Sequence, residues 1–350
     1  MTSPNLLRRY QKTLAYVLAV SAVAGAIYGG VLTYILAYGE PHELLEDIVR
    51  GTLRGIFTGL MIGGLIGWFD IFLVNTGRAR LRSLPFLWLV LIKGAYYTAA
   101  ILGSVWLGGQ LFRIDGDPGT GFNRTTIITV AFALLFSTVF SFVMEMSLLL
   151  GPGVLGNMLR GRYHHPRREN RLFVFFDMRG STAIAERIGD LAFHRLLNRF
   201  FSDLTEPVLS WRGVIHKYVG DEMIVTWPLD GRRDASGGFA AVAEAHARLD
   251  SLRDDYLRDF GVAPQFRAVL HAGEVVTGEM GEVKREIVLL GDTINTTARI
   301  EQLAKSLPEH ATIASAEAVA AVPPPGVAAT PLGQFSLPGK SAAITLFAVS

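Results

Sequence analysis

Cysteine is absent from this chain of 350 residues. Its absence excludes a disulfide framework and a thiolate metal site, as expected for a catalytic part kept in a reducing compartment. A large charge excess is also missing, because the net charge is only +2. The composition therefore gives no support for nucleic-acid binding through a basic face or tail. The adjacent His164 and His165 lack a third ligand at helical spacing, which favours a solvated polar linker over a metal site.

Long apolar runs dominate the first 159 residues. Four of them reach the roughly 20 residues that a helix needs to cross a bilayer. They cover residues 14–37, 55–74, 84–107 and 126–150. The first run is too long for a cleaved signal peptide, and three more follow it. The pattern predicts an all-α four-helix transmembrane bundle over residues 1–153.

The charges between the apolar runs indicate the orientation of this bundle. Basic residues cluster before the first run, between the second and third, and after the fourth, whereas the other two connections are acidic or balanced. Because basic loops stay on the cytoplasmic side, both termini are expected in the cytoplasm. The basic residues are Arg8, Arg9, Lys12, Arg78, Arg80, Arg82, Arg160, Arg162, Arg167 and Arg168.

Three ionisable residues, Asp70, Lys93 and Glu145, lie within the predicted spans and in the same leaflet. Charges at such depth cost on the order of 3 kcal/mol each unless they are paired. Lys93 could pair with either carboxylate. A structural ion pair is favoured over a ligand, proton or voltage sensor, because nothing else in the sequence marks a pocket.

Glycines recur every four residues in two of the predicted spans, as Gly25 and Gly29 in the first and as Gly59, Gly63 and Gly67 in the second. Such stripes let helix backbones approach closely. Packing within one chain and a dimer contact explain them equally well.

After a short linker at residues 154–170, the pattern alternates between strands and helices. Gly220 and Asp221 form the kind of two-residue turn that closes a β-hairpin. The element order β-α-β-β-α-β predicts an α+β domain of the ferredoxin-like kind, with its helices on one face of the sheet. Strands are predicted at 171–177, 214–219, 222–227, 265–271, 274–280, 286–290 and 343–349, and helices at 181–187, 191–209, 235–256 and 293–305.

Two aspartates in this half indicate phosphate and metal chemistry. Asp177 ends a strand, and Gly180 opens the turn into a helix whose first N–H groups suit an anion. Asp221 stands at the tip of the hairpin. Carboxylates on adjacent strand ends can hold Mg²⁺ ions that activate a hydroxyl and neutralise a phosphate. From the spacing alone, a purely structural role is equally compatible with both residues.

Five segments resemble the catalytic domain of class III adenylate and guanylate cyclases. Residues 175–182 (FFDMRGST) resemble the first metal motif, and residues 217–222 (KYVGDE) resemble a substrate lysine followed by the second metal aspartate. Residues 267–274 (RAVLHAGE) and 291–299 (GDTINTTAR) are similar to the arginine strand and the asparagine–arginine helix of the family. Lys340, in LPGK at 337–340, lies where the family carries a phosphate-binding lysine. The resemblance implies a nucleotidyl cyclase domain at residues 171–350.

The resemblance also implies roles for individual residues. Asp177 and Asp221, with the backbone of Met178, would hold two Mg²⁺ ions per site, for which Mn²⁺ can substitute. Arg299 would stabilise charge on the α-phosphate, and Asn295, one helical turn earlier, would orient the ribose. The other substrate-binding positions would be Arg267 and Lys340 at the β- and γ-phosphates, the N–H groups near Gly180 and Ser181, and Lys217 and Val288 at the base.

By the same resemblance, the chain is a membrane-bound adenylate cyclase that converts ATP to cyclic AMP and pyrophosphate in a bacterial inner membrane. In this family one subunit supplies the metal aspartates, and the other supplies the asparagine, the arginine and the base-reading residues. A head-to-tail homodimer is therefore expected through the catalytic domain, with the transmembrane bundle as a second candidate contact. No nucleic-acid partner is expected.

The choice of base depends on two positions. Lys217 stands where adenylate cyclases keep a lysine, whereas Val288 stands where they commonly carry Asp or Thr to bond the exocyclic amine. Valine cannot make that bond, but ATP remains favoured. The alternatives are a guanylate or unselective cyclase, a catalytically silent nucleotide-binding membrane receptor, and a transporter or channel built on the four helices. The intact set of site residues disfavours the silent receptor, and one ion cluster is thin support for a transport path.

Three further polar residues near the motifs have structural interpretations. His216 and His271 lie within predicted strands and are expected to be packed or locally hydrogen-bonded. Glu222 follows the metal aspartate and is expected to point to the opposite face of its strand.

Overall fold

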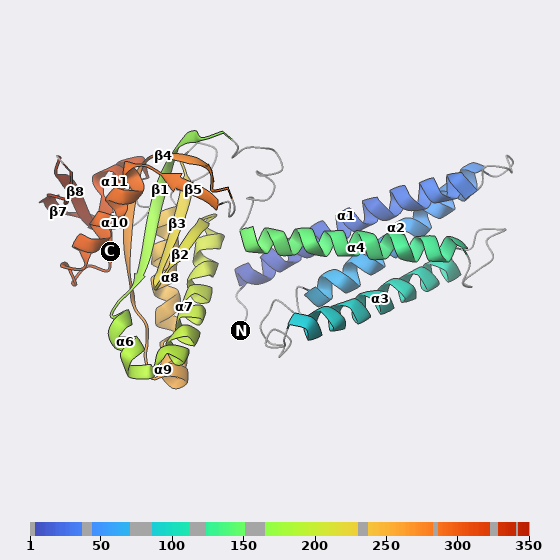
Figure 1. Ribbon diagram of the computed structural model, residues 1–350, viewed down its shortest axis with the longest axis horizontal. Coiled ribbons are helices and arrows are strands. Elements are labelled where there is room, and N and C mark those ends of the chain that lie inside the picture. Colours follow the sequence, from blue (N-terminus) through green and yellow to red (C-terminus); the bar gives the residue numbers. More distant parts are fainter. Residues whose placement is uncertain are drawn as a thin grey trace. The chain divides into compact units, whose positions relative to one another are not determined.

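The computed structural model describes residues 4–36, 44–70, 86–112, 124–150, 165–229, 237–282, 286–322, 328–340 and 342–349. The chain divides into two compact units, Met1–Met146 and Ser147–Ser350, which are described separately (Figure 1). Most of the predicted linker at 154–170 lies outside the described residues. So does the predicted connection that carries Arg78, Arg80 and Arg82.

Four long helices make up the first unit, and each overlaps one of the predicted spans. They are α1 (Pro4–Leu36), α2 (Leu44–Trp68), α3 (Phe86–Leu111) and α4 (Arg124–Leu150). Within the described residues, one helix is long and apolar enough to cross a membrane, Gln11–Ile35 with a mean hydropathy of 1.8. The apolar stretch Thr126–Val139 of α4 is shorter. These residues support one membrane span, and the other three spans stay predictions.

The glycine stripes lie between α1 and α2 of the same chain. A Cβ atom added to Gly25 would collide with the carbonyl oxygen of Gly55, and one added to Gly55 would collide with that of Gly25. Gly59 and Gly63 approach Ser21 of α1 in the same way. The sequence left open whether these glycines serve packing within one chain or a dimer contact. In the structure their surfaces are occupied by packing within one chain.

The structural ion pair that the sequence favoured forms between Asp70 and Lys93, and it is partly buried. The Nζ atom of Lys93 lies 3.1 Å from Oδ1 of Asp70, and the hydroxyl of Tyr97 donates a 2.5 Å hydrogen bond to Oδ2. The three residues join the end of α2 to α3. The side chain of Glu145, the other candidate partner, lies outside the described residues.

The fourth helix packs against the first and the third. The hydroxyl of Tyr28 in α1 donates a 3.0 Å hydrogen bond to Thr129 of α4, and its ring stacks on Phe132 at 4.2 Å. Ile101 of α3 and Ala133 of α4 share a small buried cluster.

The second unit is built on one mixed sheet in the order β2-β3-β1-β4-β6-β8-β7, with β5 also paired to β4. Its first four strands have the ferredoxin-like order that the sequence predicted. Only the pairing of β4 with β6 is parallel among the described strands. The strands are β1 (Arg167–Met178), β2 (Val214–Val219), β3 (Glu222–Pro228), β4 (Phe266–Met280), β5 (Glu286–Leu290), β6 (Thr312–Ser315), β7 (Ala329–Phe335) and β8 (Ile344–Val349).

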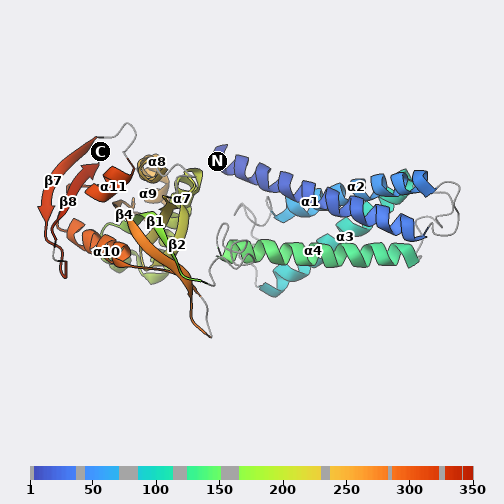
Figure 2. The same ribbon diagram turned by 90° about the horizontal axis from the view of Figure 1, so that it is seen from above.

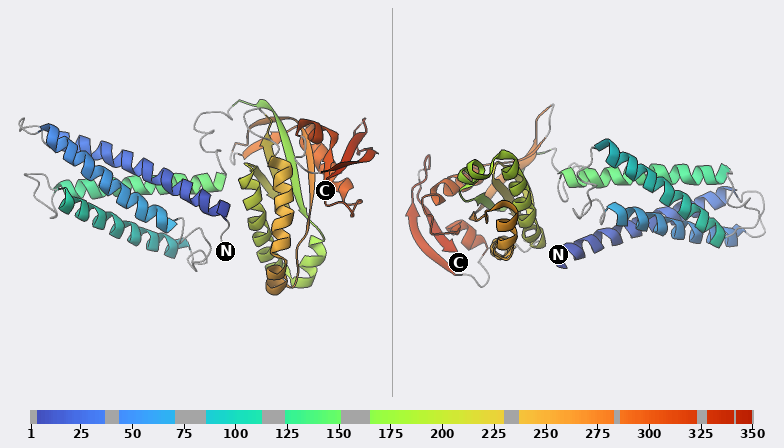
Figure 3. Two further views of the ribbon diagram at one scale, coloured as in Figure 1. Left: turned by 180° about the vertical axis from the view of Figure 1, so that it is seen from behind. Right: turned by 90° about the horizontal axis from the view of Figure 1, so that it is seen from below.

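Helices cover both faces of this sheet, so the prediction of helices on one face was wrong. The even-numbered side chains of β1, such as Val174 and Phe176, pack on α7 and α8, which stand before the sheet in olive and ochre in Figure 3, left. The odd-numbered Phe173 and Phe175 pack on Ile294 of α10, on the other side of the sheet (Figure 2). The reason is that the central strands are apolar on both faces. The helices are α6 (Ser181–Ile188), α7 (Asp190–Ser210), α8 (Gly237–Ser251), α9 (Arg253–Phe260), α10 (Asp292–Ala304) and α11 (Ala316–Ala321).

The boundaries of β2 and β5 agree with the predicted ones, and two other predictions need correction. The strands predicted at 265–271 and 274–280 are one continuous strand, β4, which runs through Gly273. A side chain at Gly273 would collide with Thr293, whose hydroxyl donates a 2.6 Å hydrogen bond to the carbonyl of Glu274. This close approach fixes the start of α10 against β4. The helix predicted at 235–256 is two helices, α8 and α9.

Candidate active site

Strand register brings three charged residues into one row at the end of the sheet. Asp177 at the end of β1 lies directly opposite Glu222 of β3 and, on its other side, opposite Arg267 of β4. Asp221 is the second residue of the tight turn that precedes Glu222, and Gly220 takes a φ of 61° there. The two aspartates that the sequence singled out are therefore close together.

Glu222 faces the same side of the sheet as Asp177, so the prediction that it points away was wrong. Residues directly opposite each other in an antiparallel pair share a face. Ile224, two residues further along β3, confirms the direction, because it joins Phe175 in the cluster under α10. Sequence reasoning placed Glu222 relative to its neighbour Asp221, which lies in the turn and not in the strand.

The C-terminal end of α10 adds two charged residues that sequence reasoning missed. Glu301 is 7% exposed, and Nζ of Lys305 lies 2.7 Å from its Oε1 atom and 3.9 Å from Oδ2 of Asp177. A usable signal was present, because Glu301 and Lys305 follow Ile294 by seven and eleven residues, the spacing of one helix face. We call Asp177, Asp221, Glu222 and Glu301 the carboxylate corner.

Burial and mutual repulsion raise the pKa values of two carboxyl groups in this corner, Asp177 and Glu222. Burial raises the pKa of Asp177 to about 6; the charge of Lys305 opposes the rise, and those of Glu301 and Asp221 add to it. Burial, and then the charges of Glu301 and Asp177, raises the pKa of Glu222 to about 7. The hydrogen bond to Glu301 raises the pKa of Lys305. Asp177 and Glu222 therefore hold protons more readily in the folded protein than they would in water.

Arg267 and the turn after β1 flank the corner. Arg267 is 6% exposed, and its Nε atom is buried without a hydrogen-bond partner. Gly180 takes a φ of 66° ahead of α6, whose first residue is Ser181. The side chain of Met178 packs in the main core, so only its backbone is available to the corner.

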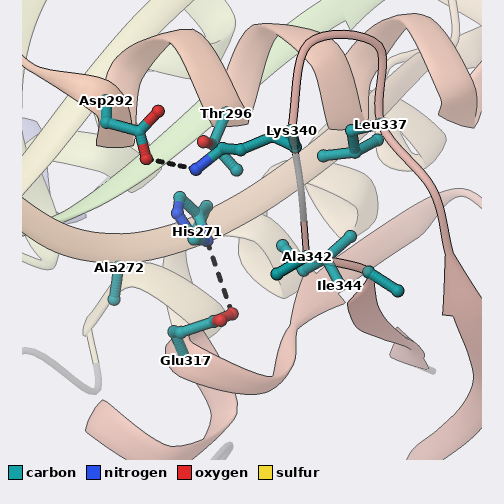
Figure 4. A pocket seen from close by; sticks show the side chains of 10 residues that line it. His271, Ala272, Asp292, Thr296, Glu317, Leu337, Lys340, Ala342 and Ile344 are labelled. Carbon is teal, nitrogen blue, oxygen red and sulfur yellow. Dashed lines mark hydrogen bonds and ion pairs between the residues drawn. The ribbon is translucent and has the colours of Figure 1, made fainter.

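A second group of site residues lies on the N-terminal half of α10 and the loop before β8. Asn295 is exposed, and Arg299 follows it by one turn. The guanidinium of Arg299 lies against Gly339, where an added Cβ atom would be 3.1 Å from its Nη2 atom. Lys340 forms an ion pair with Asp292, drawn as a dashed line in Figure 4. This contact lowers the pKa of Asp292.

A pocket of about 220 Å³ adjoins Lys340 and Asp292. His271 lines it from below in Figure 4. Its Nδ1 atom is 2.7 Å from the hydroxyl of Ser315 and 3.7 Å from a carboxylate oxygen of Glu317. His271 is 6% exposed, so the prediction of a packed, hydrogen-bonded histidine is confirmed. Its burial lowers its pKa.

The two residues predicted to read the base, Lys217 and Val288, lie near one carboxylate, Glu286. Lys217 on β2 has its Nζ atom 3.6 Å from Oε2 of Glu286, the first residue of β5. Val288 follows Glu286 by two residues on the same face of β5, opposite Gly278. Glu286 was not among the predicted residues.

Comparison with known proteins identifies the family. Residues 164–350 match the family described as the adenylate and guanylate cyclase catalytic domain. The chain belongs to the class III nucleotidyl cyclases. This cyclase is 34% identical over 245 residues to adenylate cyclase 2 of Rhizobium meliloti (strain 1021). The aligned region covers 69% of this chain and 68% of that protein.

Two further comparisons are consistent with the family. The cyclase is 33% identical over 138 residues to an uncharacterised protein of Mycobacterium tuberculosis, covering 39% of this chain and 24% of that one. It thus spans about a quarter of that relative's length. The structure of a bacterial light-regulated adenylyl cyclase aligns with a TM-score of 0.53 at 22% identity, over 65% of this chain and 66% of that chain. That likeness shows the fold.

Class III cyclases generally use divalent metal ions, and the carboxylate corner fits such an ion. Its donors are oxygens, the ligands that Mg²⁺ prefers. The Oε1 atom of Glu222 is buried without a hydrogen-bond partner, as expected where charge awaits a cation. Among the described residues, no group of three or more His, Asp or Glu side chains is arranged to hold a metal ion, so the fit rests on the chemistry of these oxygen donors.

Proposed function

We propose that the chain is a membrane-bound adenylate cyclase that converts ATP to 3′,5′-cyclic AMP and pyrophosphate in a homodimeric site. The convergence of Asp177 and Asp221 at one end of the sheet, beside the buried Arg267, carries this proposal. Two carboxylates and a cation in one corner suit a substrate that brings both a metal ion and a polyphosphate.

Asp177 and Asp221, with the backbone of Met178, would hold two Mg²⁺ ions, for which Mn²⁺ can substitute. Bound there, the metal supplies a lowered pKa for the ribose 3′-hydroxyl and a counter-charge for the phosphates. Arg267 would neutralise the β- and γ-phosphates as the pyrophosphate leaves. The free N–H groups after Gly180, beginning at Ser181, would bind the same oxygens.

Arg299, Asn295 and Lys340 would act on the substrate from the other subunit. Asp177 contacts Lys305, whereas Asn295 lies ten residues earlier on α10, about 15 Å along the helix axis. Arg299 and Glu301 point about 200° apart around the helix. This separation favours a site shared by two copies, in which Asn295 orients the ribose and Arg299 stabilises the α-phosphate charge.

ATP is the proposed substrate because Lys217 can donate to N1 of adenine, which accepts a hydrogen bond, whereas guanine carries a hydrogen there. The name of the Rhizobium meliloti relative supports the same choice. Val288 cannot bond the exocyclic amine, so a guanylate or unselective cyclase is the second candidate.

The helical unit is proposed to be a four-span anchor, with residues 1–153 in the membrane, 154–170 as a linker and 171–350 as the catalytic domain. Large apolar side chains exposed on all four helices support this proposal, among them Ile27, Leu45, Trp106 and Leu135. Such faces suit lipid. Both termini would lie in the cytoplasm of a cell with an inner membrane.

The test is cyclic nucleotide production by the purified full-length protein in nanodiscs, with ATP and GTP separately and with Mg²⁺ or Mn²⁺. We expect cyclic AMP from ATP and none from the Asp221→Ala variant. Cyclic GTP as the main product would overturn the choice of substrate. Absence of product with both nucleotides and both metals would favour a silent nucleotide-binding receptor.

A further inference from the structure

The carboxylate corner already holds a cation of its own. The ammonium of Lys305 is 2.7 Å from Glu301 and 3.9 Å from Asp177. Its charge also opposes the rise in the pKa of Glu222. The hydrogen bond to Glu301 and the charge of Asp221 both raise the pKa of Lys305, so this one lysine interacts with all four carboxylates.

The two cations at the corner differ in their freedom to move. Arg267 is 6% exposed and fixed within β4 between two paired strands. Lys305 caps the C-terminus of α10, and 55% of its side chain is exposed. Its flexible four-carbon stem can carry the ammonium into solvent without moving the backbone.

We propose that Lys305 is an intramolecular counter-ion that occupies the corner in the metal-free cyclase and is displaced when a divalent cation binds. This inference rests on the proposed metal site at Asp177 and Asp221. A divalent cation at Asp177 and the ammonium compete for the same carboxylate oxygens and repel each other at such a distance. Lys305 thereby lowers the metal affinity while it protects the metal-free fold from carboxylate repulsion.

Glu301 keeps Lys305 close to the corner during this exchange. Four residues separate it from Lys305 on one helix face, so the pair can persist while the contact with Asp177 is lost. The ammonium then stays at the edge of the corner and returns when the metal leaves. Lys305 is a positioning residue in this scheme, because it acts on the metal through the shared carboxylates and not on the substrate.

Metal binding and thermal unfolding of the full-length protein, without nucleotide, test the proposal. Mn²⁺ binding would be followed by electron paramagnetic resonance, and the unfolding temperature would be measured in EDTA and in Mn²⁺. The variants are Lys305→Met, Lys305→Arg, which keeps the charge, and Arg187→Met, which removes a positive charge from the exposed side of α6.

Lys305→Met is expected to bind Mn²⁺ roughly tenfold more tightly, because the competing charge is gone. Its unfolding temperature in EDTA should be lower than that of the wild type. Mn²⁺ should raise the unfolding temperature of this variant by more than it raises that of the wild type. Lys305→Arg and Arg187→Met should match the wild type in Mn²⁺ affinity.

Unchanged or weaker Mn²⁺ binding by Lys305→Met, with normal binding by the wild type, would overturn the exchange and leave the proposed function intact. Failure of the wild type itself to bind Mn²⁺ would overturn both. If Arg187→Met gained as much Mn²⁺ affinity as Lys305→Met, the cause would be the change in net charge and not the position of Lys305. That result would also overturn the proposal.

Discussion

Asp177 and Glu222 lie directly opposite each other on β1 and β3, on the face of the sheet that α10 covers, where Asp177 is buried and Glu222 half-buried. Side chains opposite each other in an antiparallel pair have Cβ atoms only about 5 Å apart. Two carboxylates so close cannot both ionise cheaply away from water. The corner is therefore electrostatically strained until cations balance it.

Two inactive variants should restore activity to each other. Asp177→Asn removes a proposed metal ligand, and Arg299→Ala removes the proposed α-phosphate contact; each should lower cyclic AMP formation at least about 100-fold. When the two are co-expressed equally and pair at random, half the dimers are mixed and each has one intact site. Activity should then recover to about a quarter of the wild type. Recovery absent from verified mixed dimers would contradict a shared site.

The stability of the metal-free protein should fall as the pH rises from about 4 to about 7. The pKa values of Asp177 and Glu222 are raised from 3.8 and 4.5 to about 6 and about 7. In that range the folded state binds more protons than the unfolded state, so the free energy of unfolding decreases with pH. The loss should be on the order of 2 kcal/mol.

Thermal unfolding in EDTA at several pH values would measure this loss. The Asp177→Asn, Glu222→Gln double variant serves as the control, and its dependence on pH should be shallower. An equal slope in both proteins would show that other groups cause the effect.

Gly55→Ala should destabilise the helical unit. The added Cβ atom meets the backbone oxygen of Gly25, which cannot move without separating α1 from α2. A cost of about 1–3 kcal/mol is expected for such overpacking. Gly94→Ala in α3 is the matched control, because no heavy atom lies within 4 Å of its added Cβ. Thermal unfolding in detergent measures both, and equal unfolding temperatures would contradict the α1–α2 packing.

Asp70→Asn should lower stability and leave the catalytic rate of the folded enzyme unchanged. The substitution leaves the ammonium of Lys93 without its 3.1 Å ionic partner, at a cost of about 3 kcal/mol. The double variant Asp70→Asn, Lys93→Met should recover part of this loss. Unfolding temperature and cyclase activity would be measured together. A changed activity at unchanged stability would instead indicate a sensor.

Lys217→Met should raise the KM for ATP by about tenfold through the loss of one hydrogen bond to the base. The fold should be little affected, because the exposed ion pair with Glu286 contributes less than about 1 kcal/mol. Val288→Thr is the companion variant, and its added hydroxyl should improve discrimination of ATP over GTP. Initial rates with both nucleotides measure these effects. An unchanged KM for ATP in Lys217→Met would show that this lysine does not bind the base.

Much of this protein could be predicted from residue order alone. Local signals are strong where a turn or an apolar run decides the structure, as at the hairpin turn of Gly220 and Asp221 and in strands β2 and β5. The same applies to the positions of the two aspartates, because Asp177 ends a strand and Asp221 lies in the hairpin turn. The roles of all predicted site residues stay predictions: Asp177, Met178, Gly180, Ser181, Lys217, Asp221, Arg267, Val288, Asn295, Arg299 and Lys340.

Other features were decided only by the tertiary structure. The partners of Glu222, Glu301 and Lys305 depend on strand register and on which face of the sheet α10 covers, and neither is encoded in a local pattern. The contact of Asp70 with Lys93 likewise depends on how α2 and α3 pack. Sequence thus determined the chemistry available to this cyclase, whereas long-range packing determined which charges share one buried corner. The physical reason is that burial and Coulomb energy depend on distances between residues far apart in the chain.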